Sequence, residues 1–204
     1  MPPTKAPAAK RRASIGSQRN PASAEAILAA AEAVLIENGL GNFSIEAVAK
    51  RAKAGKPTIY RWWPSKAALL LDVYHHQKHM IPHPDNGEIR TDLAEFITGL
   101  LAFWKEGSGG AVFRSIIAEA QNDTAASKAL SDYAAERRRA SGQMIRNAQI
   151  RSEVRLDIDP ELVAEMLSSF AWNRLLTDRL ETSPEEIQSL VDMVTSGICV
   201  SRPD

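Results

Sequence analysis

The sequence predicts an all-α protein of about nine helices, and three observations favour this fold class. Apolar residues recur at helical spacing along most of the 204 residues. No segment shows a convincing alternation of apolar and polar residues, which a half-buried β-strand would need. Gly, Pro, Asn and Asp interrupt the chain at intervals that suit helix ends. The helices expected from these signals cover residues 21–38, 44–51, 55–63, 65–80, 91–105, 111–120, 125–150, 160–179 and 184–200.

The first helix is expected to begin at Pro21, because proline suits the first turn, where the backbone N–H has no intrahelical partner. Asn38 and Gly39 favour its end. The apolar spacing predicts one buried face, which consists of Ile27, Ala30, Ala31, Val34 and Leu35.

The next two helices lie within residues 44–63 and are joined by a short turn. Ser44 can cap the first of them through its hydroxyl, while Ile45, Val48 and Ala49 make one buried face. The second carries the run KPTIYRWW, which is rich in residue types that contact nucleic acid. This order predicts a helix-turn-helix motif.

Several side chains of the second helix suit recognition of DNA. Arg61 could fork onto guanine, and Lys56 could reach a guanine edge or a phosphate. Pro57 and the methyl group of Thr58 offer an apolar contact to a thymine methyl. The hydroxyls of Thr58 and Tyr60 are better suited to phosphate oxygens.

The residues around the motif have other expected roles. Lys66, at the start of the fourth helix, combines a cation with a helix N-terminus and therefore suits a phosphate. Ile59 and Trp63 are expected in the core, whereas Trp62 either packs beside them or faces DNA. Glu46 is expected to be a solvated carboxylate rather than a group that reads bases.

The fourth helix is expected to run to about Met80, where Ile81-Pro82-His83-Pro84 stops it and favours a domain boundary. Breaks at residues 107–110, 122–123, 156–159 and 182–183 separate the later helices. The last two helices carry apolar stripes that suit either an internal core or contact with a second subunit. These stripes consist of Leu162, Val163, Met166, Leu167, Phe170 and Ala171, and of Ile187, Leu190, Val191, Val194 and Ile198.

Charge divides the chain although its net charge is zero. Residues 1–80 carry 12 Lys and Arg against 5 Asp and Glu, a net charge of +7, and residues 81–204 carry −7. The basic part suits a polyanion such as DNA. Within it, residues 1–20 form a basic arm without any acid, which is expected to be disordered on its own. The arm is either a solubilising tail or a segment that follows the phosphate backbone or enters the minor groove.

Other signals exclude several classes of protein. The single cysteine, Cys199, excludes an internal disulfide, and no apolar run approaches the ~18 residues that span a membrane. No signal peptide is recognisable, so a cytoplasmic protein without a membrane partner is expected. His75, His79 and His83 recur at helical spacing, but no Cys or nearby carboxylate completes a metal site. Neither a cofactor nor catalysis is indicated, since the chain has no Gly-rich phosphate loop, no G-x-S-x-G and no paired carboxylates in a recognisable setting.

The run Thr58-Ile59-Tyr60, Trp62-Trp63 and Pro64-Ser65-Lys66 resembles the DNA-binding domain of the TetR family of bacterial transcriptional regulators. The resemblance extends from Ala22 to about Met80. Two departures are visible: Lys53 stands where the family often has a glycine, and Gly55 where it often has a capping serine. The turn is therefore expected to be less well determined, because Lys is strained in a left-handed conformation and Gly caps less well than Ser.

The resemblance implies a basic arm over residues 1–20, a DNA-binding domain over residues 21–81 and a C-terminal ligand-binding and dimerisation domain over residues 82–204. It implies a homodimer in which the last two helices of each subunit form a four-helix bundle. Two recognition helices must reach successive major grooves, roughly 34 Å apart. The resemblance places base contacts at Lys56, Pro57, Thr58, Arg61 and Trp62 and phosphate contacts at Tyr60 and Lys66, and the expected DNA-binding set also includes Ser44.

The implied function is repression of transcription, with release from a palindromic operator when a small molecule binds the C-terminal domain. Arg137 lies on an apolar stripe and is expected to face inward, where it meets either an acid or a negative group of the ligand. Two alternatives remain: a constitutive or architectural helix-turn-helix protein without effector, and a helical enzyme or carrier that has kept the motif. The residues expected to line the pocket, each of which could equally be core, are Phe103, Trp104, Phe113, Ile117, Tyr133, Arg137, Met144, Phe170 and Trp172.

Overall fold

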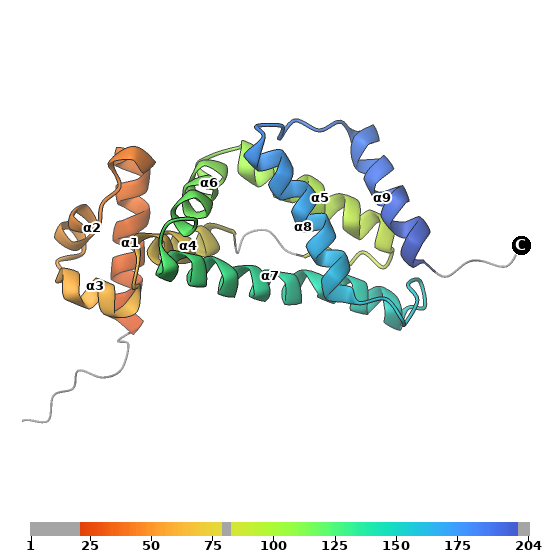
Figure 1. Cartoon of the computed structure of the whole chain (residues 1–204), viewed down its shortest axis with the longest axis horizontal. Helices are drawn as coiled ribbons and strands as arrows, with labels where there is room; N and C mark the ends of the chain where they lie inside the picture. The colour runs from red at the N-terminus through yellow and green to blue at the C-terminus, as the bar shows by residue number, and fades with distance from the viewer. Residues whose placement is uncertain (1–20, 79–82, 200–204) are drawn as a thin grey trace, which may run out of the picture.

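The computed structural model describes residues 21–78 and 83–199, and every regular element within these residues is a helix, as predicted (Figure 1). The only pairing of extended backbone within them is an isolated bridge between Val154 and Cys199. The elements are α1 (Pro21–Asn38), η1 (Leu40–Asn42), α2 (Ile45–Ala52), α3 (Lys56–Trp62), α4 (Lys66–Lys78), α5 (Ile89–Lys105), α6 (Gly109–Ala120), α7 (Thr124–Ile150), α8 (Pro160–Leu176) and α9 (Pro184–Ile198). The predicted basic arm, the predicted helix end at Met80, the stop at Ile81-Pro82, and His79 and Val200 lie outside the described residues.

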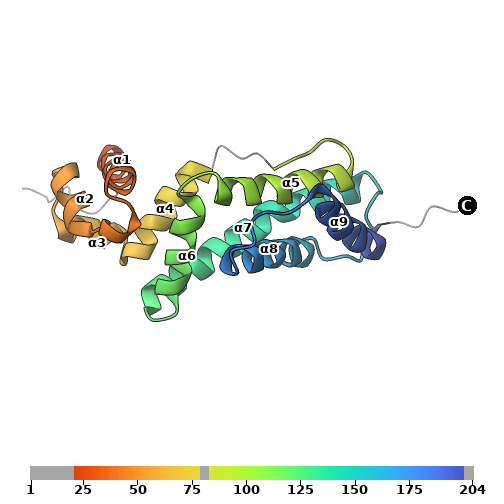
Figure 2. The same ribbon diagram turned by 90° about the horizontal axis from the view of Figure 1, so that it is seen from above.

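The first three helices form a small unit at one end of the molecule (Figures 1 and 2). The predicted apolar face of α1 is buried in full. At the start of α2 the Ser44 hydroxyl accepts a hydrogen bond from the Ala47 N–H at 3.2 Å, which confirms the predicted cap. The helix ends at Lys53, which has φ 50° and ψ 37°, the left-handed conformation expected where the family often has glycine.

Helix α4 runs from this unit to the C-terminal helices (Figure 2). Its first turn is capped by the Ser65 hydroxyl, which accepts from the Ala68 N–H at 3.1 Å. The helix is buried on nearly all sides, since Leu69, Leu70 and Tyr74 are each fully inaccessible to solvent. It packs against α1 on the one hand and against α6 and α7 on the other. A displacement of α4 would therefore disturb its packing against both the N-terminal unit and the C-terminal helices.

Helices α4, α5, α6 and α8 pack against the long helix α7, which runs along one side of the C-terminal part, and α9 packs against α5 (Figure 1). The predicted break over residues 107–110 is wrong at its end, because α6 begins at Gly109. A side chain at Gly110 would place its Cβ only 2.4 Å from the Trp104 carbonyl oxygen, so glycine is needed there to admit α5 against the start of α6. Helix α5 begins earlier than predicted, at Ile89, and α8 ends earlier, at Leu176.

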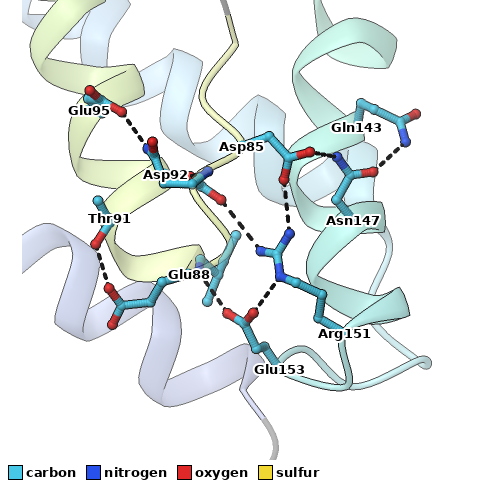
Figure 3. A network of polar contacts seen from close by, with 11 residues as sticks. Asp85, Glu88, Thr91, Asp92, Glu95, Gln143, Asn147, Arg151 and Glu153 are labelled. Atoms are coloured by element: carbon cyan, nitrogen blue, oxygen red, sulfur yellow. Dashed lines mark hydrogen bonds and ion pairs between the residues drawn. The ribbon is translucent and has the colours of Figure 1, made fainter.

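A network of polar contacts ties the segment before α5 to the end of α7 (Figure 3). The Arg151 guanidinium contacts Asp85 at 2.9 Å, Asp92 at 3.5 Å and Glu153 at 2.5 Å. Asp92 is fully buried and also accepts a hydrogen bond from the Asn86 N–H at 2.7 Å. Because a buried carboxylate without a cation is strongly destabilising, Arg151 fixes Asp85 and the first turn of α5 against the end of α7.

The apolar stripe of α9 lies inside the subunit. Ile187, Val191, Val194 and Ile198 are buried, and α9 packs against α5 of the same chain. The expectation that these residues meet a second subunit is therefore wrong; the alternative, an internal core, is the one observed. On α8 the predicted stripe is divided, because Leu167 and Ala171 are buried whereas two of its members, Leu162 and Met166, are exposed.

Candidate DNA-binding surface and ligand cavity

Helix α3 is anchored by two apolar side chains and exposes the rest. Ile59 and Trp63 are buried, as predicted, and fix the helix against the small N-terminal unit. Gly55 precedes the helix without a side-chain cap, which leaves its first turn open toward solvent. The predicted contact residues Lys56, Pro57, Tyr60 and Arg61 are exposed, and Thr58 and Trp62 are half-buried.

An ion pair joins the two helices of the motif on this surface. The Lys56 ammonium contacts the Glu46 carboxylate, and both side chains remain at least half exposed. The hydrogen bond from Lys56 is the largest of the effects that lower the pKa of Glu46. Glu46 is thus solvated, as expected. It also forms an ion pair with Lys56, the cation that was expected to reach DNA.

The two tryptophans at the end of α3 are in contact with one another. Their rings meet edge to face with centroids 5.9 Å apart. The guanidinium of Arg61 lies 5.7 Å from the centre of the Trp62 ring, a cation–π contact that uses one face of the guanidinium plane.

Two further predicted residues lie beside the motif. The ammonium of Lys66, in the first turn of α4, stands 5.8 Å from the centre of the Phe43 ring. Ser44 caps α2, and its half-buried hydroxyl keeps its own proton, which it can still donate. Both residues therefore combine a structural contact with a remaining donor.

Helix α4 connects the recognition helix with the interior of the C-terminal part. Trp63, directly after α3, donates its indole N–H to the Asp72 carboxylate of α4 at 2.6 Å. Two residues further along α4, the hydroxyl of Tyr74 accepts a hydrogen bond from the Trp104 indole N–H at 2.7 Å. Tyr74 also lies on the wall of a cavity.

This cavity has a volume of about 220 Å³ and lies among α4, α5, α6, α7 and α8. Five of the nine residues expected to line a pocket do line it: Trp104, Phe113, Tyr133, Arg137 and Trp172. The sequence did not indicate the remaining lining residues, which are Tyr74, Phe96, Leu100, Ala134, Arg138, Ser141, Glu165, Ser168 and Ser169.

The other four expected pocket residues lie outside this lining. Met144 is buried in the core, and Phe103 packs edge to face against Tyr74 with centroids 5.5 Å apart. Phe170 lies under the Arg174 guanidinium at 4.9 Å, and Ile117 is half-buried against the core. Aromatic or apolar character alone therefore did not separate cavity wall from core.

Two polar groups at the cavity have no hydrogen-bond partner. They are the Tyr133 hydroxyl and the Nε of Arg137, both fully buried. Burial raises the pKa of Tyr133 well above its usual range, and it raises that of Tyr74 likewise. The Tyr74 phenol is near enough to affect the Tyr133 pKa, but the two hydroxyls do not meet in hydrogen-bond geometry. Both phenols are protonated at neutral pH.

A second hollow, of about 910 Å³, lies between α5 and the connection from α8 to α9. It is larger, but it is an open groove, and no residue of α4 lines it. The smaller cavity is the better candidate for a ligand that acts on DNA binding, because it alone of these two contacts α4.

In residues 21–78 and 83–199, no group of three or more His, Cys, Asp or Glu side chains is placed to hold a metal ion. His83 stacks against Phe96, with ring centroids 5.9 Å apart, and its Nε2 lies 3.1 Å from the Ser141 hydroxyl. Over the same ranges no helix combines the length and apolar character needed to cross a membrane.

Comparison with known proteins agrees with this architecture. Residues 27–73 match the model of bacterial regulatory proteins of the tetR family, and residues 83–194, more than half of the chain, match that of the tetracyclin repressor-like C-terminal domain. Among curated relatives, the HTH-type transcriptional regulator YdeS of Bacillus subtilis is 27% identical over 90% of this chain and 93% of its own.

The DNA-binding transcriptional repressor TetR of Mycobacteroides abscessus is 32% identical over 74% of this chain and 80% of its own. The crystal structure of the TetR family transcription regulator SCO0332 superposes with a TM-score of 0.76 at 27% identity, covering 87% of this chain and 99% of that one. The chain therefore belongs to the TetR family of DNA-binding transcriptional regulators, which are not enzymes.

Proposed function

We propose that this regulator is a repressor that binds a palindromic operator as a homodimer and leaves it when a small molecule occupies the cavity. The DNA-binding set is the exposed surface of α3 with its two flanking donors. Its members are Ser44, Lys56, Pro57, Thr58, Tyr60, Arg61, Trp62 and Lys66. Because its partner is operator DNA, the regulator acts in the cytoplasm.

The observation that carries this proposal is that one helix, α4, borders both the recognition helix and the cavity. Asp72 holds Trp63 at the end of α3, and Tyr74 is part of the cavity wall. A ligand that displaces Tyr74 therefore moves α4 and, with it, the spacing of the two recognition helices. To act as an inducer the ligand must bind the displaced state more tightly, because equal affinity for both states would shift nothing.

The exposed face of α8 and α9 supports dimerisation at this pair of helices. Leu162, Met166 and Leu176 on α8 and Met193 on α9 are between 52% and 69% exposed. The three residues of α8 follow helical spacing and form one stripe on the side away from the core. Arg174 near the end of α8 pairs with Glu186 in the first turn of α9 at 2.8 Å, which links the two helices at one point.

The first test is selection of duplexes from a random library by the purified chain, followed by fluorescence anisotropy on a selected and a scrambled duplex. We expect an inverted repeat that binds two chains and is preferred by about a thousandfold or more at one fixed salt concentration. Equal affinity for both duplexes would overturn the assignment to a specific regulator.

The second test separates the repressor from a constitutive DNA-binding protein. Small molecules that raise the melting temperature of the chain are added to the complex with the selected duplex. Release from the operator is the expected result. Compounds that bind the cavity and leave operator affinity unchanged would favour the constitutive alternative.

A further inference from the structure

The charges around the cavity are unequal, and this indicates the class of ligand. Three charged side chains line it: Arg137, Arg138 and Glu165. Arg138 is already neutralised, since it contacts Glu165 at 3.1 Å and Glu161 at 3.5 Å. Arg137 therefore determines the charge that faces a ligand.

Arg137 is only partly satisfied by the protein. One terminal nitrogen contacts the adjacent Glu136 at 2.8 Å, but that carboxylate is half exposed and reaches it from the solvent side. The Nε on the inner side is buried without a partner. A buried donor without an acceptor is destabilising, and a guanidinium presents its N–H groups as a fork that matches a carboxylate.

Tyr133 supplies a second donor at the same place. The Arg137 guanidinium lies 5.9 Å from the centre of its ring, one helical turn away on α7. The Tyr133 side chain is buried, and its hydroxyl has no partner. Because the phenol is protonated, it can donate to an anionic oxygen.

Aromatic side chains form a further part of the wall. Trp104 and Phe113 are stacked with centroids 5.7 Å apart, and Trp172 meets Phe113 edge to face at 5.2 Å. The volume of about 220 Å³ is below the roughly 300–1,000 Å³ of pockets for drug-sized ligands. A molecule of one ring or two fused rings suits this space.

We infer that the effector is a small planar aromatic carboxylate whose carboxylate binds Arg137 and Tyr133 while its ring lies among Trp104, Phe113 and Trp172. This inference rests on the proposed function, which assigns the cavity to the effector. A neutral ring would leave the two donors unpaired.

The test measures binding to the free chain by isothermal titration calorimetry, without DNA. The probes are 2-naphthoate, its neutral counterpart 2-naphthamide, and octanoate as a flexible acid. We expect 2-naphthoate to bind at least about tenfold more tightly than either of the others, since a hydrogen bond to a charged group contributes about 1.5–3 kcal/mol. Absence of naphthoate binding, or equal binding of the amide, would overturn the inference. Equal binding of octanoate would overturn its aromatic part.

Variants locate the contact. Arg137→Gln should weaken naphthoate binding by roughly tenfold to a hundredfold and abolish the preference over the amide, and Tyr133→Phe should weaken it by roughly threefold to tenfold. Arg139→Gln is the matched control, because Arg139 is exposed and lies outside the cavity. Arg137→Lys keeps the positive charge but loses the paired N–H donors of the guanidinium. Its affinity for naphthoate should therefore lie between those of Arg137→Gln and the unaltered chain. Naphthoate binding that Arg137→Gln leaves unchanged would place the anion elsewhere.

Operator affinity of each variant without ligand is measured in parallel. If the chain binds its operator specifically and no probe binds the cavity, only this inference fails. If naphthoate binds as expected and no duplex is preferred, the proposed function fails.

Discussion

The indole N–H of Trp63 donates to the Asp72 carboxylate at 2.6 Å, and this bond joins the end of the recognition helix to the middle of α4. Trp63 is buried, so its position fixes the last turn of α3. Asp72 precedes the cavity residue Tyr74 by two positions on the same helix. The proposed route from the cavity to DNA therefore passes through one short stretch of α4.

We expect Asp72→Ala to loosen α3 from α4. Loss of a hydrogen bond to a charged acceptor should lower the free energy of unfolding by about 1.5–3 kcal/mol. Operator binding should weaken as well, because the helix is no longer held at the correct angle. Urea unfolding and anisotropy measure the two effects. Asp72→Asn is the control, since its amide oxygen still accepts, and it should keep most of the stability; equal losses for both variants would contradict the role of this bond.

The phosphate contact of Lys66 is tested by its salt dependence. Lys66→Ala should weaken binding about equally on all duplexes and reduce the slope of log affinity against log salt by roughly one. The ammonium lies near the Phe43 ring, so a change in melting temperature is checked separately. Lys128→Ala removes an exposed lysine of α7 that pairs with Asp132, and it should leave the slope unchanged. An unchanged slope for Lys66→Ala would remove this residue from the interface.

The local signals in the sequence predicted local structure well. The hydroxyl cap at Ser44, the proline at the start of α1 and the left-handed Lys53 each depend on neighbours within one turn, which a sequence displays directly. The buried face of α1 follows from the same 3.6-residue period.

The partner of an apolar face was not predictable in this way. Periodicity shows that Val191 and Val194 lie on one side of α9 but not whether α5 or a second subunit covers them. The cavity posed the same difficulty, because Tyr74 and Ser168 meet there from helices almost a hundred residues apart. The pairing of Lys56 with Glu46 likewise depends on how α3 is set against α2.

Substitutions on the exposed and on the buried apolar faces of the last two helices should have different effects on dimerisation and folding. Leu162→Glu with Met166→Glu should give a folded monomer in sedimentation, because both residues are exposed in the single subunit and their charges would meet in the dimer. Val194→Glu should instead unfold or aggregate, since it places a carboxylate in the core against α5. Ile36→Glu is the control: Ile36 is even more exposed, and its helix α1 lies at the other end of the molecule from α9 (Figure 1), so this variant should remain dimeric. A folded dimer from the Leu162 and Met166 variant would place the interface elsewhere.

Specificity for the operator is assigned to Arg61 rather than to Lys56. Arg61 is the only guanidinium on the recognition helix, and a forked contact with guanine is worth about 1–3 kcal/mol against the wrong base. Arg61→Ala should therefore lose roughly tenfold to a hundredfold on the operator and little on random duplex. A change at the guanine that it reads should then have no further effect on the variant. Equal loss on both duplexes would assign Arg61 to phosphate.

The ion pair with Glu46 decides what Lys56 can contribute. While the carboxylate holds the ammonium, Lys56→Ala removes a neutralised cation and should change operator affinity less than Arg61→Ala does. Glu46→Gln releases Lys56 and removes a negative charge from the DNA-facing surface, so binding should tighten on operator and random duplex alike, with a steeper salt dependence. The pKa of Glu46 is lowered in the folded chain, so its carboxylate stays charged throughout the neutral range. The difference in DNA affinity between Glu46→Gln and the unaltered chain should therefore be the same at pH 6 and at pH 8. Anisotropy at fixed salt measures it. If Glu46→Gln gains affinity only on the operator, Lys56 reads a base once it is released. Base recognition would then rest on Lys56 as well as on Arg61.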